Sequence, residues 1–428
     1  MPAKLIEVTG NRVKIELTVE LSRSMLETEE AIQGALHGAG CLASREALGY
    51  FDTDGSPIQI GAELWRTKGR QPKCYQTPYG EVELERHVSQ RSGGGATYCP
   101  LERDARIVIT STPRFAKQVS SKLAQGAARE VQRDLAENPG RPVAVSYLQR
   151  LSEAIGTVVQ AKETEWEYAL PPFDVPVASI SVGLDGTGML LCEDGWREAM
   201  VGTIALFDAD GERLHTLYVA ATPEYGKSTF LERLDRELER VKARYPQATY
   251  IGLADGAEGN WGFLTPRTAV QLIDFYHASG YLAAAAEAVF PKPQDKAARQ
   301  QWLKDQCHRL KHETGAAKAL LDEMQRLPTA ELTVTQRERL DRAITYFYYH
   351  HHQMDYAAAV KQHWPIGSGV TEAACKTLVK QRLCRSGMRW KEKGAAVVLS
   401  LRALMLTPDR WRQFWDKLDR FGFPVAVS

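Results

Sequence analysis

The sequence predicts a mixed α/β protein whose sheet is interrupted by an all-helical insertion. Three observations predict this. After Pro171-Pro172, short β-branched runs alternate with one amphipathic helical pattern. From about 278 to 363 the pattern is charged and helical, without strand signals. Before 171, extended runs are followed by short helical patterns. The fold class is therefore α/β, a mixed sheet preceded by a mixed region and a helical region.

The length of 428 residues predicts two to four units. The expected boundaries are 1–112 (mixed α+β), 113–170 (helical), 171–277 (first part of the sheet domain), 278–363 (helical insertion) and 364–428 (remainder, ending in basic helices). Hydrophobic content of 44% and charged content of 25% are typical of a globular protein and exclude a disordered or fibrous chain.

Membrane and secretory classes are disfavoured. The apolar stretch from Ala395 to Leu406 is interrupted by Arg402 and is too short for a bilayer. The first sixteen residues contain no apolar signal segment, and the seven cysteines are scattered without a C-x-x-C pair. We therefore expect a cytoplasmic protein with reduced thiols and no membrane partner.

In the first 112 residues the sequence predicts a helix near 21–40, a hairpin over 73–90 around Pro78-Tyr79-Gly80 and a loop over 92–100. Helices are expected from 114 to 166. The first follows Ser111-Thr112-Pro113, the second ends at Pro139-Gly140, and the third has Ser146 as a candidate cap. This spacing fits a DNA-binding helix-turn-helix, and equally a small helical bundle.

Beyond residue 171, strands are expected over 179–185, 196–208 and 214–222, then a helix over 228–246 and a strand over 249–255. The run 269–277 is either a short strand or the start of a helix. The order β-β-β-α-β, a meander followed by a crossover helix, is that of an RNase H-like sheet. In such sheets functional side chains gather beyond the carboxyl ends of the strands.

Three carboxylates occupy positions that suit a two-metal site. Asp185 and Asp255 each end an apolar run that breaks into glycine, and Glu372 lies in the first turn of an expected helix. Two Mg²⁺ ions about 3.5–4 Å apart activate a nucleophile and neutralise charge on a phosphodiester. Asp185 would bridge both ions, and Asp255 and Glu372 would each hold one, with Mn²⁺ able to substitute for Mg²⁺.

Each residue alone has an ordinary explanation. A strand-end Asp-Gly is common turn chemistry, and a glutamate in a first helical turn is favoured by the helix dipole. The three carboxylates together, in this order of strands and helices, predict the metal site.

The chain becomes basic after the third carboxylate. Residues 361–428 hold 13 Lys+Arg against 5 Asp+Glu, a difference of +8. The expected helix places Lys376 and Lys380 on the face of Glu372, and five more cations follow: Arg382, Arg385, Arg389, Lys391 and Lys393. We expect these seven side chains to contact a DNA backbone, although a solvated helical face is the alternative.

Asp274 and His277, spaced i,i+3, are candidates for a supporting catalytic role in proton transfer or ligand orientation. The alternative is a structural Asp–His hydrogen bond. The segment from Ala221 to Ser228 is rejected as a phosphate-binding loop because Ala221 replaces the first glycine and Glu224 would repel phosphate.

The chain resembles the ISKra family of bacterial insertion-sequence transposases, within the DDE group. The segments VGLDGTG, WREAMVG, LADGAEGNW, LIDFYHA and especially IGSGVTEAACKTLVKQRLCRSGMRW carry this resemblance over about 180–415. It implies an RNase H-like catalytic domain with Asp185, Asp255 and Glu372 as the triad and a helical insertion before the glutamate.

The function we expect is that of a Mg²⁺-dependent transposase. It would bind the terminal inverted repeats of its element, hydrolyse DNA at the ends and join the 3′-hydroxyls to target DNA. Its partners would be double-stranded DNA and a second copy of the chain, in the cytoplasm at the nucleoid. The alternative is a DNA-binding protein whose RNase H-like core is silent or regulatory.

Overall fold

The computed structural model describes residues 2–138 and 140–423. Pro139, where the second of the predicted helices was expected to end, lies outside them, as do residues 424–428 of the predicted C-terminal region. The chain is mixed α/β, as predicted, and forms two compact units. As far as they are described, the first comprises 1–169, 400–405 and 409–428, and the second comprises 170–399 and 406–408.

The first unit begins with a hairpin of β1 (Ala3–Thr9) and β2 (Arg12–Leu17), packed on the long helix α1 (Met25–Gly49). Ser24 caps this helix through the backbone amide of Glu27. A four-stranded antiparallel sheet follows: β3 (Ile58–Ile60), β4 (Glu63–Gln76), β5 (Glu81–Arg91) and β6 (Thr97–Tyr98). The predicted hairpin around residues 78–80 is therefore confirmed.

Short helices complete this unit: α2 (Pro100–Asp104), α3 (Pro113–Gln125), α4 (Ala128–Glu137) and α5 (Val145–Ala161). Thr112 is the N-cap residue of α3 and Pro113 its first residue, as predicted. The N-cap residue of α5 is Ala144, so the expectation for Ser146 was wrong. Helices α3, α4 and α5 pack on one another, and α5 buries most of one side between Leu148 and Val158.

The second unit contains a five-stranded sheet in the order β11-β10-β7-β8-β9. Its strands are β7 (Ser179–Leu191), β8 (Gly195–Phe207), β9 (Arg213–Ala221), β10 (Thr249–Ala254) and β11 (Val270–Ile273). β7, β8 and β9 form an antiparallel meander, while β10 and β11 run parallel to β7. The run that was ambiguous in the sequence is both a strand (β11) and a helix start.

Two helices connect the strands of this sheet. A 3-10 turn η1 (Tyr225–Lys227) leads into α6 (Ser228–Arg244), and α7 (Glu258–Leu264) follows β10. A Cβ on Gly202 of β8 would lie 3.0–3.1 Å from Leu234 and Phe230, so α6 covers this face of the sheet closely. Glu224 accepts hydrogen bonds from the backbone amide of Thr229 and from the hydroxyls of Ser228 and Thr229. A carboxylate thus occupies the start of α6, where a phosphate-binding loop would need a phosphate.

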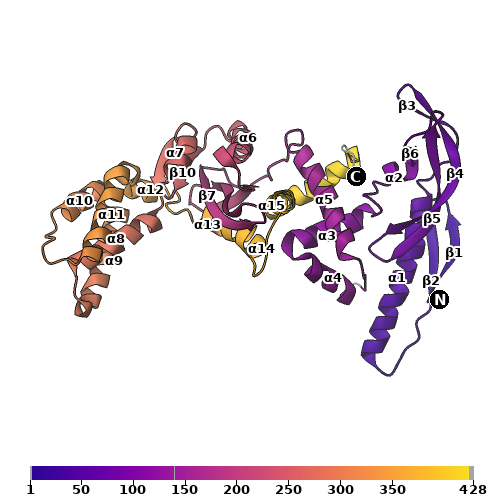
Figure 1. Ribbon diagram of the computed structural model, residues 1–428, viewed down its shortest axis with the longest axis horizontal. Helices are drawn as coiled ribbons and strands as arrows, with labels where there is room; N and C mark the ends of the chain where they lie inside the picture. The colour runs from indigo at the N-terminus through magenta and orange to yellow at the C-terminus, as the bar shows by residue number, and fades with distance from the viewer. Residues whose placement is uncertain (1, 139, 424–428) are drawn as a thin grey trace. The chain divides into compact units, whose positions relative to one another are not determined.

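The predicted helical insertion is present and starts slightly earlier than expected. It consists of α8 (Phe275–Val289), η2 (Pro293–Asp295), α9 (Lys296–His312), α10 (Ala316–Gln325), α11 (Val334–His350), η3 (His351–Gln353) and α12 (Tyr356–Lys361). Figure 1 shows these helices, in orange, gathered beyond β10. Their apolar faces join the core of the sheet domain through Ala278, Leu340 and Phe347.

The last part of the chain is less regular than a single helix. α13 (Gly369–Ala374) passes into a π-helical segment η4 (Cys375–Lys380) and then α14 (Gln381–Leu383). α15 (Glu392–Leu406) and α16 (Arg410–Phe421) follow. Residues 364–428 were expected to hold the rest of the sheet domain and the basic C-terminal helices; as far as they are described, residues 400–405 and 409–428 belong to the first unit. Among the described residues, no helix is both long and apolar enough to span a bilayer.

Candidate functional site

The two aspartates belong to neighbouring parallel strands, Asp185 within β7 and Asp255 directly after β10. β10 pairs with β7 from Thr249↔Ser179 to Gly252↔Val182, a constant offset of 70 residues. The same offset, continued three residues further along both strands, aligns Asp255 with Asp185. Side chains at equal level on adjacent strands point to the same face. Asp255 directly follows the carboxyl end of β10, whereas Asp185 lies within β7, six residues before its last residue. The two are close enough for the charge of Asp255 to act on Asp185.

Each aspartate accepts a hydrogen bond from a nearby backbone amide with one carboxylate oxygen. Asp185 Oδ1 accepts a hydrogen bond of 2.7 Å from the amide of Gly186, and Asp255 Oδ1 accepts one of 3.1 Å from the amide of Ala257. Burial raises the pKa of Asp185 above its ordinary value, and the negative charges of Asp255 and Glu198 raise it further. A half-buried carboxylate whose neighbours are also anionic is the electrostatic setting that a divalent cation relieves.

Helix α13 is held on the same face by a fitted contact. Gly183, two residues before Asp185, has no side chain, and a Cβ there would overlap Thr371 Oγ1. The Thr371 hydroxyl fills this space and makes a buried hydrogen bond of 2.7 Å with the Thr203 hydroxyl on β8, which pairs with Gly183. The residue next to Glu372 is thereby fixed against the strand that carries Asp185.

The π-helical segment brings a further group to Asp185. Cys375 is buried, and its thiol donates to Asp185 Oδ2 at 3.7 Å. Burial and the Asp185 charge raise the pKa of this thiol to about 12, so it remains protonated and able to donate. Sequence reasoning missed Cys375, although its i,i+3 spacing from Glu372 places it on the adjoining part of the helix.

Glu372 is on the right helix, but its carboxylate is not gathered with the aspartates. Its side chain is exposed, and Oε1 accepts a hydrogen bond of 3.1 Å from the Ser368 hydroxyl. Within residues 2–138 and 140–423, no three His, Cys, Asp or Glu side chains form a group that could hold a metal ion. Carboxylate oxygens are the ligands that Mg²⁺ prefers, so the donor set fits this ion chemically. The observed arrangement is an open one, in which the charge of Asp255 acts on Asp185 and the side chain of Glu372 is exposed.

Asp274 has a structural position. It is 1% exposed, and Oδ1 caps α8 by accepting from the backbone amide of His277 at 2.6 Å. Oδ2 accepts from the backbone amide of Ser368. The hydrogen bond between Asp274 and His277 therefore joins the carboxylate to the backbone amide of His277, which agrees with the structural alternative. The supporting catalytic role of the two residues stays a prediction. Asp274 instead ties the end of β11 to the loop that precedes α13.

The insertion reaches the second aspartate through an aromatic group. Tyr346 of α11 donates its hydroxyl to the backbone carbonyl of Asp255 at 2.8 Å. Its ring stacks on Tyr281 with centroids 3.9 Å apart, and the exposed His277 ring lies 5.8 Å from it. His350 also contacts Tyr346, and burial lowers the pKa of its imidazole. Sequence reasoning missed Tyr346 and had no signal for it, because the contact joins positions 91 residues apart.

The predicted DNA-contacting cations divide into two groups. Six are exposed, namely Lys376, Lys380, Arg385, Arg389, Lys391 and Lys393. Arg382 is 3% exposed, and its guanidinium lies 5.0 Å from the centroid of the Trp390 ring. A buried cation stacked on an aromatic ring cannot reach a DNA backbone, so the expectation for Arg382 was wrong.

The segment after α14 is fastened to the strand that bears Asp185. Pairing between β7 and β10 ends at Val182. Beyond it, residues 384–390 lie along the same edge of β7. Cys384 donates its thiol to the Gly188 carbonyl at 3.4 Å. Trp390 donates its backbone amide to Leu190 and accepts from Cys192, at 3.1 and 2.9 Å. The exposed cations of residues 385–391 are thus held beside the aspartate end of the sheet.

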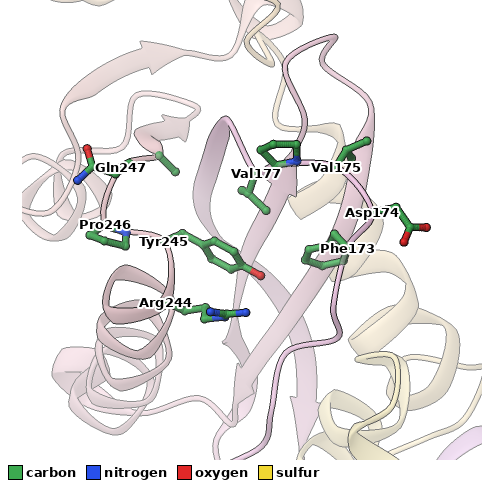
Figure 2. Close-up of a pocket in the computed structure, with 10 residues that line it drawn as sticks. Phe173, Asp174, Val175, Val177, Arg244, Tyr245, Pro246 and Gln247 are labelled. Atoms are coloured by element: carbon green, nitrogen blue, oxygen red, sulfur yellow. The ribbon is translucent and has the colours of Figure 1, made fainter.

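Two cavities of this unit lie away from the carboxylates. One, of about 490 Å³, is bounded by the segments before β7 and after α6. Figure 2 shows Phe173, Val177 and Tyr245 pointing into it, with Arg244 beside the Tyr245 ring. It adjoins the amino ends of β7 and β10, opposite to the carboxyl ends where function is expected. The other, of about 580 Å³, lies before α13 and is lined in part by Arg213, Tyr276, Lys311 and His363.

Comparison with known proteins adds no further assignment, since no protein-family profile matches the chain and no curated protein is significantly similar to it.

Proposed function

We propose that this chain is a Mg²⁺-dependent DDE transposase that cleaves DNA at the ends of its element and joins the 3′-hydroxyls to target DNA. The observation that carries the proposal is the register of the sheet. β10 pairs in parallel with β7 up to three residues before Asp255 and Asp185, and Thr371, next to Glu372, packs against Gly183 of β7; these contacts support a shared site.

The strand order supports an RNase H-like sheet. A three-stranded antiparallel meander followed by two strands parallel to the first, with a crossover helix between, is the order expected for that fold. The helical insertion between β11 and Glu372 agrees with the resemblance to ISKra transposases. The fold does not by itself determine the chemistry, which rests on the carboxylates.

In this proposal Asp185, Asp255 and Glu372 hold two Mg²⁺ ions. The ions supply Lewis-acid activation of water or a 3′-hydroxyl and neutralise charge on the phosphate. The chain's own residues position the ligands. Gly186 and Ala257 orient the aspartates through their amides, and Cys375 restrains the second oxygen of Asp185. Glu372 reaches the aspartates by turning its exposed side chain away from Ser368.

The DNA backbone is bound by the exposed cations that follow α13, since each phosphate contact releases counterions and contributes affinity. The helical region of α3, α4 and α5 is proposed to bind the terminal inverted repeats. Pairing two element ends requires at least two copies of the chain. These assignments place the protein at the bacterial nucleoid.

Cleavage of a labelled duplex that carries the DNA flanking the coding sequence tests the proposal. Wild type should cut with Mg²⁺ or Mn²⁺ and not with EDTA. Asp185→Asn, Asp255→Asn and Glu372→Gln should each bind the duplex and fail to cut it. Glu338→Gln removes an exposed carboxylate from α11 and should cut like wild type. Cutting that survives the three site substitutions would show that the site is elsewhere.

A second candidate is a DNA-binding protein with a silent core. The observation that favours it is the open arrangement, in which the described residues form no three-ligand metal group. Such a protein would bind the same duplex equally with and without Mg²⁺ and would never nick it. Mg²⁺-dependent nicking by wild type would exclude this candidate.

A further inference from the structure

The cavity of about 580 Å³ in the second unit lies where four segments meet. They are the turn between β8 and β9, the start of α8, the end of α9 and the chain that joins α12 to α13. Its lining has one acidic residue, Asp210, and three basic residues, namely Arg213, Lys311 and His363. We call this cavity the basic pocket. Three basic groups around one hollow favour an anionic ligand.

The two permanent cations of the basic pocket are not neutralised by other side chains. Among the described residues, neither the Arg213 guanidinium nor the Lys311 ammonium has an ion pair or a hydrogen-bond partner. By contrast Arg309, also on α9, pairs with Glu323 at 2.8 Å. The positive charge of the pocket is therefore available to a ligand.

The walls of the pocket are held by two close approaches to glycine. A Cβ on Gly211 would lie 2.6 Å from the His363 carbonyl oxygen, so the turn that precedes Arg213 rests directly on the end of α12. A Cβ on Gly367 would lie 2.8 Å from Cε2 of Tyr276, so this ring packs on the chain before α13. These backbone contacts fix the segments that carry the basic side chains.

His363 has a backbone conformation that glycine adopts more easily, with φ at +56°. Its amide donates to the Val360 carbonyl at 3.1 Å. The amide of Trp364 donates to the Ala359 carbonyl at 2.9 Å. These two bonds form a Schellman motif at the end of α12, in which glycine usually occupies the position of His363. A histidine there costs conformational free energy, which favours a role for its side chain.

The pocket adjoins the helix that carries Glu372. None of the three candidate metal ligands lines it, but Gly369 does, and Glu372 follows Gly369 by three residues on α13, about 4.5 Å along the helix axis. The Ser368 hydroxyl, which donates to Glu372, belongs to the residue between two lining residues, Gly367 and Gly369. A ligand in the pocket is therefore about one helical turn from Glu372.

We propose that the basic pocket binds a backbone phosphate of DNA, to which Arg213, Lys311 and His363 donate hydrogen bonds. Phosphate contacts position a strand without reading its sequence, and this one would bring the strand next to Glu372. The inference rests on the proposed function for the identity of its ligand. It adds a contact separate from the basic segment that follows α14.

The test is binding of the full-length chain, in EDTA and over a range of salt concentrations, to two labelled duplexes of unrelated sequence. The double variant Arg213→Ala/Lys311→Ala should bind both duplexes roughly 3- to 30-fold more weakly. Its salt slope should be smaller by about 0.9, as expected for the loss of one phosphate contact. Lys304→Ala is the matched control and should bind like wild type, because Lys304 is an exposed cation of α9 that does not line the pocket.

Two further variants separate a binding role from a structural one. Asp210→Asn removes the acidic group of the lining and should tighten binding to both duplexes by roughly 2- to 5-fold. His363→Gly relieves the backbone conformation and should raise the melting temperature by about 2–4 °C, while DNA binding becomes weaker. A purely structural residue would not combine higher stability with lower affinity.

Unchanged duplex affinity in the double variant would overturn the inference, as would an equal loss in Lys304→Ala. Thymidine monophosphate distinguishes a free nucleotide from DNA. If it binds wild type but not the double variant, and duplex affinity is unchanged, the inference is also overturned. Thermal melting identifies a loss that comes from misfolding, in which case the single variants Arg213→Ala and Lys311→Ala replace the double variant.

A parallel cleavage assay with Mg²⁺ separates this inference from the proposed function. Wild-type cutting without an effect of the pocket variants on affinity overturns the phosphate contact alone. An effect of the pocket variants on affinity without any cutting by wild type overturns the transposase assignment alone.

Discussion

Gly183→Ala is the substitution for which the structure gives the sharpest expectation. The added methyl group would overlap Thr371 Oγ1 and would lie 3.3 Å from the Leu253 carbonyl and 3.4 Å from Thr203 Oγ1. Gly183 is buried between β8 and β10, so the strand cannot yield easily. We therefore expect α13 to move away from the sheet and to carry Glu372 with it.

The expected cost follows from overpacking. Adding a methyl group to a well-packed interior costs about 1–3 kcal/mol. For a unit of this size, 1 kcal/mol corresponds to about 2–4 °C in melting temperature. Gly183→Ala should therefore melt about 2–12 °C below wild type. It should still bind DNA through the exposed cations and should lose metal-dependent cleavage, because Glu372 is displaced.

A double-mutant cycle tests the stated cause. Thr371→Ala removes the overlapping hydroxyl and leaves the buried Thr203 hydroxyl without this partner, which costs about 1–3 kcal/mol. In the double variant the methyl group introduced by Gly183→Ala occupies the vacated space. The double variant should be no less stable than Thr371→Ala, so the two effects should be strongly non-additive. Gly280→Ala is the matched control, since a Cβ there meets nothing within 4 Å in α8 and should be neutral or slightly stabilising.

The assay is thermal melting of the four variants in EDTA, followed by Mg²⁺-dependent cleavage. Additive losses in the cycle would refute the proposed contact between Gly183 and Thr371. A Gly183→Ala protein that melts like wild type would refute the close seating of α13 on the sheet.

Three further predictions follow from single contacts. Tyr346→Phe removes the hydroxyl that supports the Asp255 carbonyl, so a Mg²⁺ titration should show half-maximal cleavage at a higher concentration, with DNA affinity unchanged. Burial and neighbouring charges raise the pKa of Asp185 above 3.8, so the folded state binds this proton more tightly than the unfolded state, and stability is lost as pH rises through the raised pKa. In EDTA, Asp185→Asn should therefore have a higher melting temperature than wild type at pH 7. The difference in melting temperature should shrink as the pH falls toward 3.8. A difference that does not change with pH would contradict this reasoning. Arg382→Ala should lower the melting temperature and leave the salt slope of DNA binding unchanged, whereas Arg389→Ala should melt like wild type and reduce that slope by about 0.9.

The sequence predicted most strands of the second unit because each consists of a short run of β-branched and apolar residues. The apolar runs over 179–185 and 249–255 indicated both strands, and the predicted carboxyl end is correct within one residue for β10 only. The six residues by which β7 continues beyond Asp185 were missed. GTGMLL has weak strand propensity, and its extension depends on cross-strand pairing with residues 195–200 of β8.

The spacing of Asp274 and His277 shows how one pattern supports two interpretations. A carboxylate three residues before an imidazole was interpreted as a catalytic pair. An aspartate three residues before any residue is also the spacing of an N-cap to the N3 amide, and this is what the structure contains. The apolar strand before it and the alanine-rich helix after it already indicated a helix start at this point.

The face assigned to Lys376 and Lys380 rested on continuous α-helical geometry. The structure has a π-helical stretch from Cys375 to Lys380, in which the turn contains an extra residue, so side-chain directions after Ala374 depart from the 3.6-residue period. Such stretches are frequent at functional sites. Here the segment contains the residue that contacts Asp185, a relation that residue types alone do not encode.

The placement of the basic segment follows from where strand pairing stops. β10 leaves β7 after Val182, three residues before Asp185, and the freed edge of β7 would expose unsatisfied backbone groups. Residues 384–390 cover that edge through backbone and thiol contacts at Gly188, Leu190 and Cys192. The same interruption therefore frees the edge of β7 beyond Val182, and the basic segment lies along that edge. Strand pairing, which residue types alone do not encode, therefore determines that Arg385 and Arg389 lie on a segment fixed to the strand of Asp185.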